Sequence, residues 1–259
     1  MTTAVIIPAR YESTRFPGKP LAKINGKAMI EWVIESALGS KLANKIIVAT
    51  DDKKIYDFVS ELAKRRTIEP TKSLEACMTL KEHKCGTDRI SEVVRHQADI
   101  KYIVNLQGDE PLMPGEYIDK VLKPLLQDTK NSMASLIALV SNPEDLNNPN
   151  IVKVVMDKNE CALYFSRSTI PYDRQNKKDI QYYKHIGIYA YTRETLLQFS
   201  LLPQSSLEIT EQLEQLRALE NGIKIKLVTV EKTFPAVDAP SDVKTVEEIM
   251  RSVPVPRSL

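Results

Sequence analysis

Cysteines and long apolar runs are scarce in this chain of 259 residues. Its three cysteines, Cys77, Cys85 and Cys161, are odd in number and form no CxxC pair. Neither a disulfide framework nor a structural zinc site is therefore expected. No apolar run approaches the roughly 18 residues that a membrane span needs, and the N-terminus shows no signal-peptide pattern. We expect a cytoplasmic protein with reduced thiols that does not act at a membrane.

Two glycine motifs of nucleotide-binding proteins are also missing. Without GxxxxGK[ST], a P-loop ATPase is disfavoured, and without GxGxxG, so is an ordinary NAD dehydrogenase. Charge of one sign is not in large excess either, because the formal net charge is only +2. A protein that coats nucleic acid needs a basic face, so we expect no nucleic-acid partner and only a local cationic patch.

The first 140 residues alternate between strand-like and helix-like patterns. β-branched runs predict buried strands at 3–9 and 45–50, and helical spacing of apolar residues predicts helices at 28–40 and 51–66. The pattern continues with a helix at 86–98, a strand at 101–107, a helix at 116–128 and a strand at 133–140. This alternation predicts an α/β fold, Rossmann-like, with a mixed and mostly parallel sheet flanked by helices.

From about residue 150 the pattern changes to consecutive strands with little helix between them. Strands are predicted at 150–157, 161–167 and 182–192, helices at 194–202 and 207–221, a late strand at 224–231 and a final helix at 240–253. We expect one domain over 1–259. Its core would comprise about 1–140 and 224–252, with an inserted, smaller β-rich lobe at about 150–222.

The segment ARYESTRFPGKPL, residues 9–21, follows the first predicted strand. In open α/β sheets, ligands bind beyond the carboxyl ends of the strands, so this segment is placed to meet one. Arg10, Arg15 and Lys19 have the groups that bind phosphate oxygens, and Gly18 allows a tight turn near the ligand. The sequence favours a polyphosphate clamp over the alternative, a solvated basic loop.

The segment NLQGDEP, residues 105–111, follows another predicted strand and has two adjacent acids, Asp109 and Glu110. Mg²⁺ takes one or two carboxylates and fills its other positions with water and substrate phosphates. A second carboxylate could come from Asp238 or Asp242 in VDAPSD. The alternative is that these acids cap helices, since Asp and Pro are common where a helix begins.

The three histidines, His83, His96 and His185, include no pair with metal-ligand spacing. His96 is expected on a helix surface, whereas His185 lies in an aromatic strand and either faces a ligand or packs. Cys85 precedes Gly86, but no histidine–acid arrangement marks it as a nucleophile. We therefore interpret Cys85 as structural.

Taken together, several segments resemble the 3-deoxy-manno-octulosonate (Kdo) cytidylyltransferases, the CMP-Kdo synthetases. IPARYESTRFPGKPL, GTDR, NLQGDEP, ALYFSRSTIP, HIGIYAY, LEQLRALENGIKI and VDAPSD occur in the order typical of that family. The resemblance covers about residues 3 to 250. It implies a fold of the nucleotide-diphospho-sugar transferase type. The implied reaction is CTP plus Kdo giving CMP-Kdo and pyrophosphate with Mg²⁺, by in-line attack of the sugar C2 hydroxyl on the α-phosphorus.

The resemblance also assigns roles to residues of the nucleotide site. It implies that Arg10, Arg15 and Lys19 hold the triphosphate, that Arg15 and Lys19 act in catalysis, and that Asp109 and Asp238 bind the metal. Cys85 and Gly86 would contact the nucleotide. The residues implied for the sugar acid are Arg89, Gln107, Arg167, Arg174, His185, Tyr189, Glu214 and Gln215.

Two departures from the family pattern stand out. Cys85 occupies a position where the family usually has serine, which bears on recognition of the base. The charged segment 63–79 replaces a shorter, glycine-containing loop. The resemblance further implies a homodimer through the β-rich lobe and a place in lipopolysaccharide synthesis. Three alternatives stay open: an 8-amino-Kdo substrate, another acid such as a sialic acid, or a catalytically silent nucleotide-binding protein.

Overall fold

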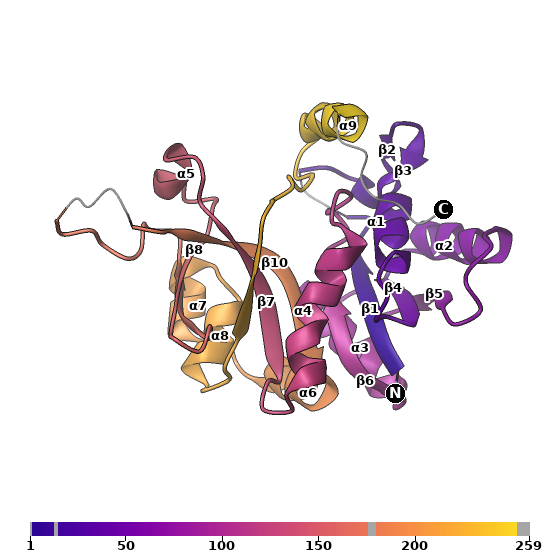
Figure 1. Cartoon of the computed structure of the whole chain (residues 1–259). Coiled ribbons are helices and arrows are strands. Elements are labelled where there is room, and N and C mark those ends of the chain that lie inside the picture. Colours follow the sequence, from indigo (N-terminus) through magenta and orange to yellow (C-terminus); the bar gives the residue numbers. More distant parts are fainter. Residues whose placement is uncertain (1, 13–14, 176–179, 253–259) are drawn as a thin grey trace. The chain divides into compact units, whose positions relative to one another are not determined.

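The computed structural model of the protein describes residues 2–12, 15–175 and 180–252. The chain divides into two compact units, which are described separately. Unit 1 comprises Met1–Leu122 and Phe234–Leu259. Unit 2, Lys123–Thr233, lies between these two ranges in the sequence (Figure 1). We expect the core at about 1–140 and 224–252 to bind the nucleotide, and the lobe at about 150–222 to bind the sugar acid and to form the dimer; these assignments stay predictions.

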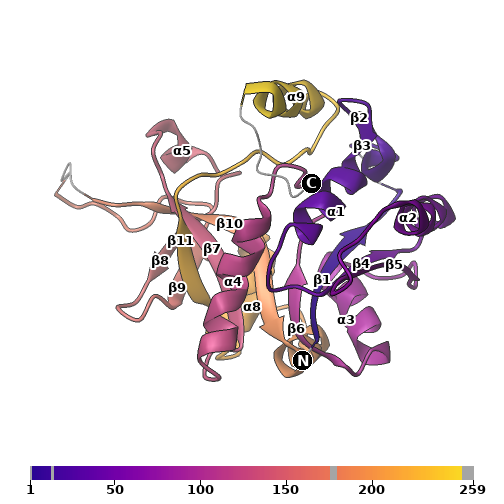
Figure 2. The ribbon, with the colours of Figure 1, turned by 45° about the vertical axis from the view of Figure 1, so that its right-hand side comes forward.

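Unit 1 is built on four parallel strands in the order β6–β1–β4–β5, which lie side by side in Figures 1 and 2. The strands are β1 (Thr2–Ala9), β4 (Lys45–Thr50), β5 (Ser73–Met78) and β6 (Ile100–Asn105). The helices that connect or follow them are α1 (Met29–Leu38), α2 (Lys53–Arg65), α3 (Gly86–His96) and α9 (Asp242–Ser252). The predicted parallel sheet with flanking helices is confirmed.

Local sequence explains where these helices begin and end. The Asp52 carboxylate accepts hydrogen bonds from the Lys54 and Ile55 amides at 2.8 and 3.1 Å, which caps the start of α2. Lys64 and Arg65 occupy the last turn, where cations favour the helix dipole. The helix predicted at 51–66 therefore forms with nearly the predicted bounds. The helix predicted at 240–253 forms as α9, and residues 253–259 lie outside the described part of the chain.

The charged segment 63–79 is not simply a loop, because it contains strand β5. β5 pairs only with β4 among the described strands, and only Leu74 of its six residues is buried. An edge strand with so little buried surface gives no clear apolar pattern, which explains why the sequence did not predict it. Unit 1 also contains three short elements that were not predicted: η1 (Lys19–Leu21), β2 (Lys23–Ile24) and β3 (Lys27–Ala28).

Unit 2 has a mixed sheet in which β7 lies between β11, parallel to it, and β10, antiparallel to it. β8 pairs antiparallel with both β10 and β9. The strands are β7 (Met133–Leu139), β8 (Lys153–Met156), β9 (Ala162–Ser166), β10 (Tyr183–Thr192) and β11 (Lys226–Val230). The helices are α5 (Glu144–Asn147), α6 (Arg193–Leu201), α7 (Ser206–Glu211) and α8 (Gln215–Glu220), and α4 (Gly115–Gln127) crosses the division between the units. The predicted run of antiparallel strands is confirmed.

The single helix predicted at 207–221 was wrong, because the chain breaks into α7 and α8. Gln212 adopts a left-handed conformation with φ of 53° and ends α7. Arg217 of α8 then reaches Glu208 of α7 through two hydrogen bonds of 2.8 Å. This buried bidentate ion pair stabilises the break that helical periodicity alone would not show.

Among the described residues, no helix combines the length and the apolar character required to cross a membrane.

Candidate active site

The strand order of unit 1 places a crevice at one end of its sheet. After β1 the chain continues to β4 on one side, whereas β6 lies on the other side of β1. At such a switch point the loops after the two strands separate, and ligands bind beyond the carboxyl ends. The loops in question begin after Ala9 and after Asn105, and they contain the two polar segments singled out in the sequence.

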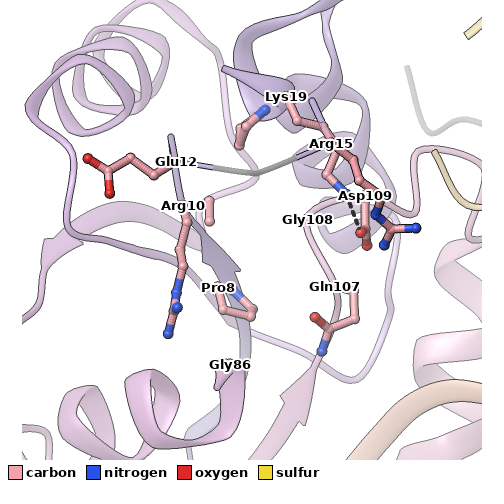
Figure 3. A pocket seen from close by; sticks show the side chains of 11 residues that line it. Pro8, Arg10, Glu12, Arg15, Lys19, Gly86, Gln107, Gly108 and Asp109 are labelled. Carbon is pink, nitrogen blue, oxygen red and sulfur yellow. Dashed lines mark hydrogen bonds and ion pairs between the residues drawn. The ribbon is translucent and has the colours of Figure 1, made fainter. Parts of the chain in front are cut away.

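A pocket of about 380 Å³ lies at this switch point (Figure 3). Its volume is in the range of small-molecule sites, roughly 300–1,000 Å³. The residues that line it come from three segments: Pro8 and Ala9 at the end of β1, with Arg10, Glu12, Arg15, Lys19 and Pro20 after it; Gly86 at the start of α3; and Gln107, Gly108 and Asp109 after β6. Figure 3 shows Arg10 extending toward the Gly86 end, while Arg15 and Lys19 stand near Asp109.

Two glycines are required by the backbone around this pocket. Gly18 has a φ of 72° and precedes η1, so it supplies the left-handed residue of the turn that orients Lys19. At Gly108, a Cβ atom would lie 3.0 Å from the Pro8 carbonyl oxygen. The absence of a side chain there lets the loop after β6 lie directly against the end of β1.

The acids and cations of the two loops pair with each other. The Lys19 Nζ atom donates to Asp109 Oδ2 at 2.6 Å and to the Val237 carbonyl at 3.0 Å. The Arg15 guanidinium lies 3.2 Å from Asp238 Oδ1, with both side chains more than half exposed. Four residues that the family pattern implies for phosphate and metal are thus arranged as two ion pairs.

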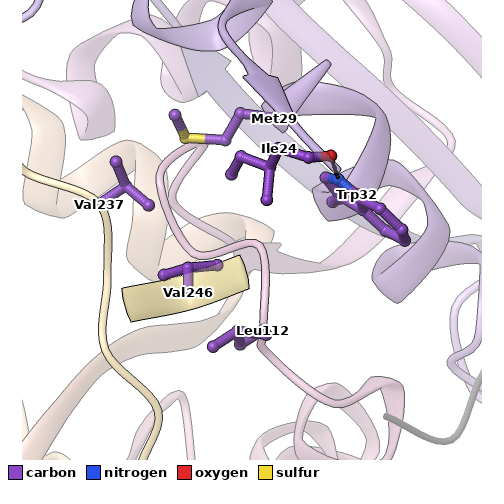
Figure 4. Packing of buried hydrophobic residues seen from close by; sticks show 6 residues of the cluster. All are labelled: Ile24, Met29, Trp32, Leu112, Val237 and Val246. Carbon is purple, nitrogen blue, oxygen red and sulfur yellow. Dashed lines mark hydrogen bonds between the residues drawn. The ribbon is translucent and has the colours of Figure 1, made fainter. Parts of the chain in front are cut away.

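The segment that carries Asp238 is fixed in unit 1 by its neighbour Val237. Val237 is buried in an apolar cluster with Ile24, Met29, Trp32, Leu112 and Val246 (Figure 4). Its amide also donates to the Asp109 carbonyl at 2.9 Å. Asp238 therefore follows directly on a residue anchored both in the core and to the loop after β6.

Glu110 has an unusual environment beside these acids. Burial, with further contributions from the charges of Asp109 and Asp238, raises the pKa of Glu110 to about 8. Since charges act on a pKa over short distances, the three carboxyl groups belong to one acidic region. Glu110 is the neutral member of this region at pH 7.

Asp242 binds backbone amides just before α9, in line with the alternative that the acids of this segment cap helices. Its Oδ2 atom accepts from the amides of Asp238 and Ala239, both at 2.8 Å, at the start of α9. These backbone hydrogen bonds lower the pKa of Asp242. Asp242 therefore stabilises the turn that presents Asp238, and its carboxylate is already engaged.

The donor set of the site fits a hard divalent cation that is shared with phosphates. Among the residues that the structure describes, no group of three or more His, Cys, Asp or Glu side chains is arranged to hold a metal. Mg²⁺ needs no such cage, because it takes one or two carboxylates and completes its octahedron with water and phosphate oxygens. Asp109 and Asp238, together with the neighbouring cations for phosphate, match that requirement.

Comparison with known proteins identifies the family. The sequence pattern of the cytidylyltransferase family matches residues 4–225. The chain belongs to the cytidylyltransferase family. Two relatives narrow this further: the 3-deoxy-manno-octulosonate cytidylyltransferases of Trichlorobacter lovleyi, 42% identical over 97% of this chain and 99% of the relative, and of Fusobacterium nucleatum, 45% identical over 93% and 94%. The resemblance to the CMP-Kdo synthetases is thus confirmed.

Solved structures agree with this assignment. A CMP:2-keto-3-deoxy-manno-octonic acid synthetase in complex with CTP superimposes with a TM-score of 0.89 at 40% identity, covering 97% of this chain and 99% of that one. The 4-diphosphocytidyl-2C-methyl-D-erythritol synthase of Anaerococcus prevotii, at 11% identity and a TM-score of 0.63, shares the fold alone. The predicted fold class of this cytidylyltransferase is therefore confirmed.

The structure gathers most residues that were predicted for the nucleotide. Arg10, Arg15, Lys19, Gly86 and Asp109 all line the pocket. Cys85 is the N-cap of α3, where its Sγ atom accepts from the Asp88 amide at 3.4 Å. A thiol can thus replace the usual serine as a cap, although weakly, since sulfur is a poor acceptor.

Two residues predicted for the sugar acid also lie in unit 1, but in different settings. Gln107 lines the pocket, and its Nε2 atom donates to Asn105 Oδ1 at 2.8 Å. Arg89 has no exposed surface; it binds Asp51 Oδ2 at 2.8 Å and also the Thr79 hydroxyl. In this structure Arg89 ties α3 to the ends of β4 and β5, so a contact with a substrate would require its side chain to move.

In unit 2, three of the predicted residues lie close together. The His185 ring packs 5.0 Å from the Phe165 ring and 5.3 Å from the Tyr189 ring. Burial lowers the pKa of His185 to about 3, so this imidazole is neutral at pH 7. Burial, and next the charge of Glu214, raises the pKa of Tyr189. His185, Tyr189 and Glu214 therefore form one group, next to the buried Gln215.

The tautomer of His185 follows from its partner Ser135. The Ser135 hydroxyl lies 2.8 Å from both His185 Nε2 and the Ile188 carbonyl. A carbonyl only accepts, so the single hydroxyl proton points to Ile188 and Nε2 must carry the proton that it donates to Ser135. The other ring nitrogen, Nδ1, is then an acceptor.

Arg167 and Arg174 differ from this group. Three nitrogens of the Arg167 guanidinium donate to backbone carbonyls: Nε to Glu211 at 2.7 Å, Nη1 to Pro149 at 2.8 Å and Nη2 to Gln212 at 3.2 Å. Arg167 is thus mainly engaged in holding the turn between α7 and α8. Arg174 is exposed, shortly before the undescribed residues 176–179.

Five pocket-lining residues of unit 1 were not predicted as site residues: Pro8, Ala9, Glu12, Pro20 and Gly108. Glu12 lies in the pocket loop and makes an exposed ion pair with Lys81 at 2.9 Å. Pro8, the penultimate residue of β1, lies next to Gly86 and Gly108, where a Cβ atom would come within 3.1 and 3.0 Å of it. The segment 9–21 pointed to the loop as a whole, but neither a glutamate nor a proline signals a ligand by itself.

Proposed function

We propose that this protein is a 3-deoxy-manno-octulosonate cytidylyltransferase, which transfers CMP from CTP to Kdo and releases pyrophosphate. The observation that carries the proposal is the pocket of unit 1. There, three cations from the loop after β1 and a carboxylate from the loop after β6 line the same pocket, in a chain 40–45% identical to enzymes of that name. A triphosphate needs several cations, and a metal shared with phosphates needs a carboxylate.

Within the pocket, each side chain has a task set by its chemistry. Arg10 and Arg15 offer planar donor pairs to phosphate oxygens, and Lys19 offers a compact charge to the departing pyrophosphate. Gly86 and Cys85, at the first turn of α3, offer backbone groups to the nucleotide. Since no covalent intermediate is needed, catalysis consists of alignment and neutralisation of charge that develops on the phosphates.

Asp109 and Asp238 would hold Mg²⁺ in this reaction. When bound, the ion supplies charge that polarises the α-phosphate and lowers the pKa of the attacking C2 hydroxyl. Lys19 and Arg15, which pair with these two aspartates, are then available to the phosphates. The capping role of Asp242 keeps the Asp238 turn in place.

The sugar acid is assigned to the predicted residues of unit 2. The predicted role of Gln107, which lines the pocket of unit 1, stays a prediction. Neutral His185 and the Tyr189 hydroxyl suit sugar hydroxyl groups, and Glu214 and Gln215 add acceptors. The structure gives Arg89 and Arg167 internal partners, and we assign them to positioning. Arg174, which is exposed, fits the sugar carboxylate best among the predicted arginines.

A homodimer that forms through unit 2 is part of the same proposal, as is a cytoplasmic location. Leu163 on strand β9, which pairs only with β8 among the described strands, is 61% exposed, and Ile209 on α7 is 54% exposed. Apolar side chains at such positions are typical of subunit contacts. Sedimentation of the wild type and of a Leu163→Glu variant tests this, since a dimer through another surface would leave the variant unchanged.

The experiment that tests the function is pyrophosphate release with CTP and Mg²⁺, comparing Kdo, 8-amino-Kdo and a sialic acid. Highest turnover with Kdo supports the proposal. Release only with the amino sugar would keep the mechanism and change the substrate, a possibility that HIGIYAY leaves open. Binding of CTP without release with any acid would instead indicate a silent nucleotide-binding protein.

A further inference from the structure

The loop at residues 79–85, between β5 and α3, is held from two sides. On one side, Glu92 of α3 accepts a hydrogen bond from the Leu80 amide at 3.0 Å, and the same Oε2 atom contacts His83 Nε2. On the other side, the Arg10 guanidinium donates to the His83 carbonyl and, at 3.5 Å, to the Cys85 carbonyl. His83 is thus bound through both its ring and its backbone.

The contact between His83 and Glu92 is a true charge-assisted hydrogen bond. Both side chains are largely buried, with exposed fractions of 14% and 17%. Burial opposes ionisation of Glu92, but the hydrogen bonds from His83 and from the Leu80 amide lower its pKa. Glu92 is therefore an acceptor only, so His83 Nε2 carries a proton and donates it.

This loop leads directly into the nucleotide pocket. It ends at Cys85, the cap of α3, and the next residue, Gly86, lines the pocket. A Cβ atom on Gly86 would lie 3.1 Å from Pro8, so the backbone there is already close to β1. A shift of the loop by a few tenths of an ångström would therefore change the shape of the pocket.

We propose that His83 and Glu92 are a positioning pair for the nucleotide. They fix the carbonyls that orient Arg10 and the backbone at Cys85 and Gly86, without touching the substrate themselves. This inference rests on the proposed function, because it takes CTP as the ligand of the pocket. It adds two residues to the recognition of CTP that the family pattern did not assign.

The chain offers a matched control on the same loop. Glu82 precedes His83 in this loop, and its side chain is exposed. Glu82→Gln makes the same chemical change as Glu92→Gln, but at a position outside the buried anchor. Exposed charges of this kind contribute little to structure.

The test is titration calorimetry of CTP with Mg²⁺, together with KM values for CTP and for the sugar acid, on wild type, His83→Ala, Glu92→Gln and the double variant. We expect CTP to bind His83→Ala about tenfold more weakly, because misplacement of positioning groups weakens ligand contacts. The KM for the sugar acid should stay unchanged. The double variant should be no weaker than His83→Ala alone, because the two residues act as one unit.

Several results would overturn the inference. One is unchanged CTP affinity in both single variants; another is an equal rise of both KM values. Strictly additive losses in the double variant, or an equal loss in Glu82→Gln, would do the same. Should His83→Ala fail to fold, Glu92→Gln decides alone, since glutamine keeps an acceptor for Leu80 and loses the charge. If the wild type binds no CTP, the proposed function fails first and this inference fails with it.

Discussion

Arg15 lies in the loop after β1 of unit 1, and Lys153 is the first residue of β8 in unit 2. Both are cations, but one is exposed and the other is buried. The Arg15 side chain is 70% exposed and pairs with the exposed Asp238 at 3.2 Å. Lys153 is fully buried, and its ammonium donates to the carbonyls of Asn148, Ile151 and Arg167 at 2.6–2.9 Å. Burial lowers the pKa of Lys153.

The comparison extends to one further cation in each unit. In unit 1, Arg15 and Lys19 pair with carboxylates that line or border a pocket, where a phosphate can replace the carboxylate as their partner. In unit 2, Arg167 and Lys153 bind backbone carbonyls inside the unit. The first group is available to a ligand, and the second holds the protein together.

The largest expected effect concerns Asp109. Asp109→Asn should lower turnover by about 10²–10³-fold, because the side chain that we propose as a metal ligand, and that pairs with Lys19, loses its charge. The unfolding temperature should stay close to that of the wild type. Asp57→Asn, at an exposed aspartate of α2, is the control and should retain full turnover. A variant of Asp109 that unfolds early would instead indicate a capping role.

The next effect concerns the buried cation of unit 2. Lys153→Met should lower the free energy of unfolding by about 1–3 kcal/mol, because three carbonyls lose their donor. The KM for CTP should not change at temperatures where the variant is folded. Urea unfolding measures the first quantity, and exposed Lys158→Met is the control. A stable Lys153→Met variant would contradict the structural role.

A third prediction uses the neutral His185. Its pKa is about 3 in the folded protein and near 6.5 in the unfolded chain, so the unfolded state binds the additional proton between these values. Stability should therefore fall as the pH drops below 6.5, by about 1 kcal/mol between pH 6 and pH 5. His185→Gln should lack this component and exposed His96→Gln should keep it. Equal pH dependence in all three proteins would contradict the lowered pKa of His185.

The smallest effect on stability is expected at Arg15. Because its ion pair with Asp238 is exposed, Arg15→Gln should change the free energy of unfolding by less than about 1 kcal/mol. The KM for CTP should nevertheless rise severalfold, because the variant lacks a guanidinium that we propose to bind the phosphates. Unfolding and kinetics at low and high salt check both statements. A large loss of stability would place Arg15 with the structural cations.

Strands with two buried faces were predicted well from the sequence, as β1 and β4 show, because continuous β-branched runs leave few alternatives. β5 was missed because it is a half-exposed edge strand. The break at Gln212 was missed because it depends on the ion pair between Arg217 and Glu208, which joins two separate turns. Periodicity describes local preference and contains no information about such tertiary contacts.

The same limit applies to the candidate site. Motif order brought Arg10, Lys19 and Asp109 to one pocket, and the structure has them there. It could not show that Arg89 and Arg167 are occupied by internal partners, since an arginine in a sequence has the same charge in either setting. Nor could it show that Asp242 caps α9 while Asp238 pairs with Arg15, because both acids stand in one short segment.

The most direct test of this comparison is calorimetric titration of CTP with Mg²⁺ into wild type, Lys19→Met and Lys153→Met, all at a temperature where the three are folded. We predict that Lys19→Met binds CTP at least about tenfold more weakly and that Lys153→Met binds it within about twofold of wild type. Equal losses in both variants, or full affinity in Lys19→Met, would contradict the assignment of the pocket cations to the nucleotide.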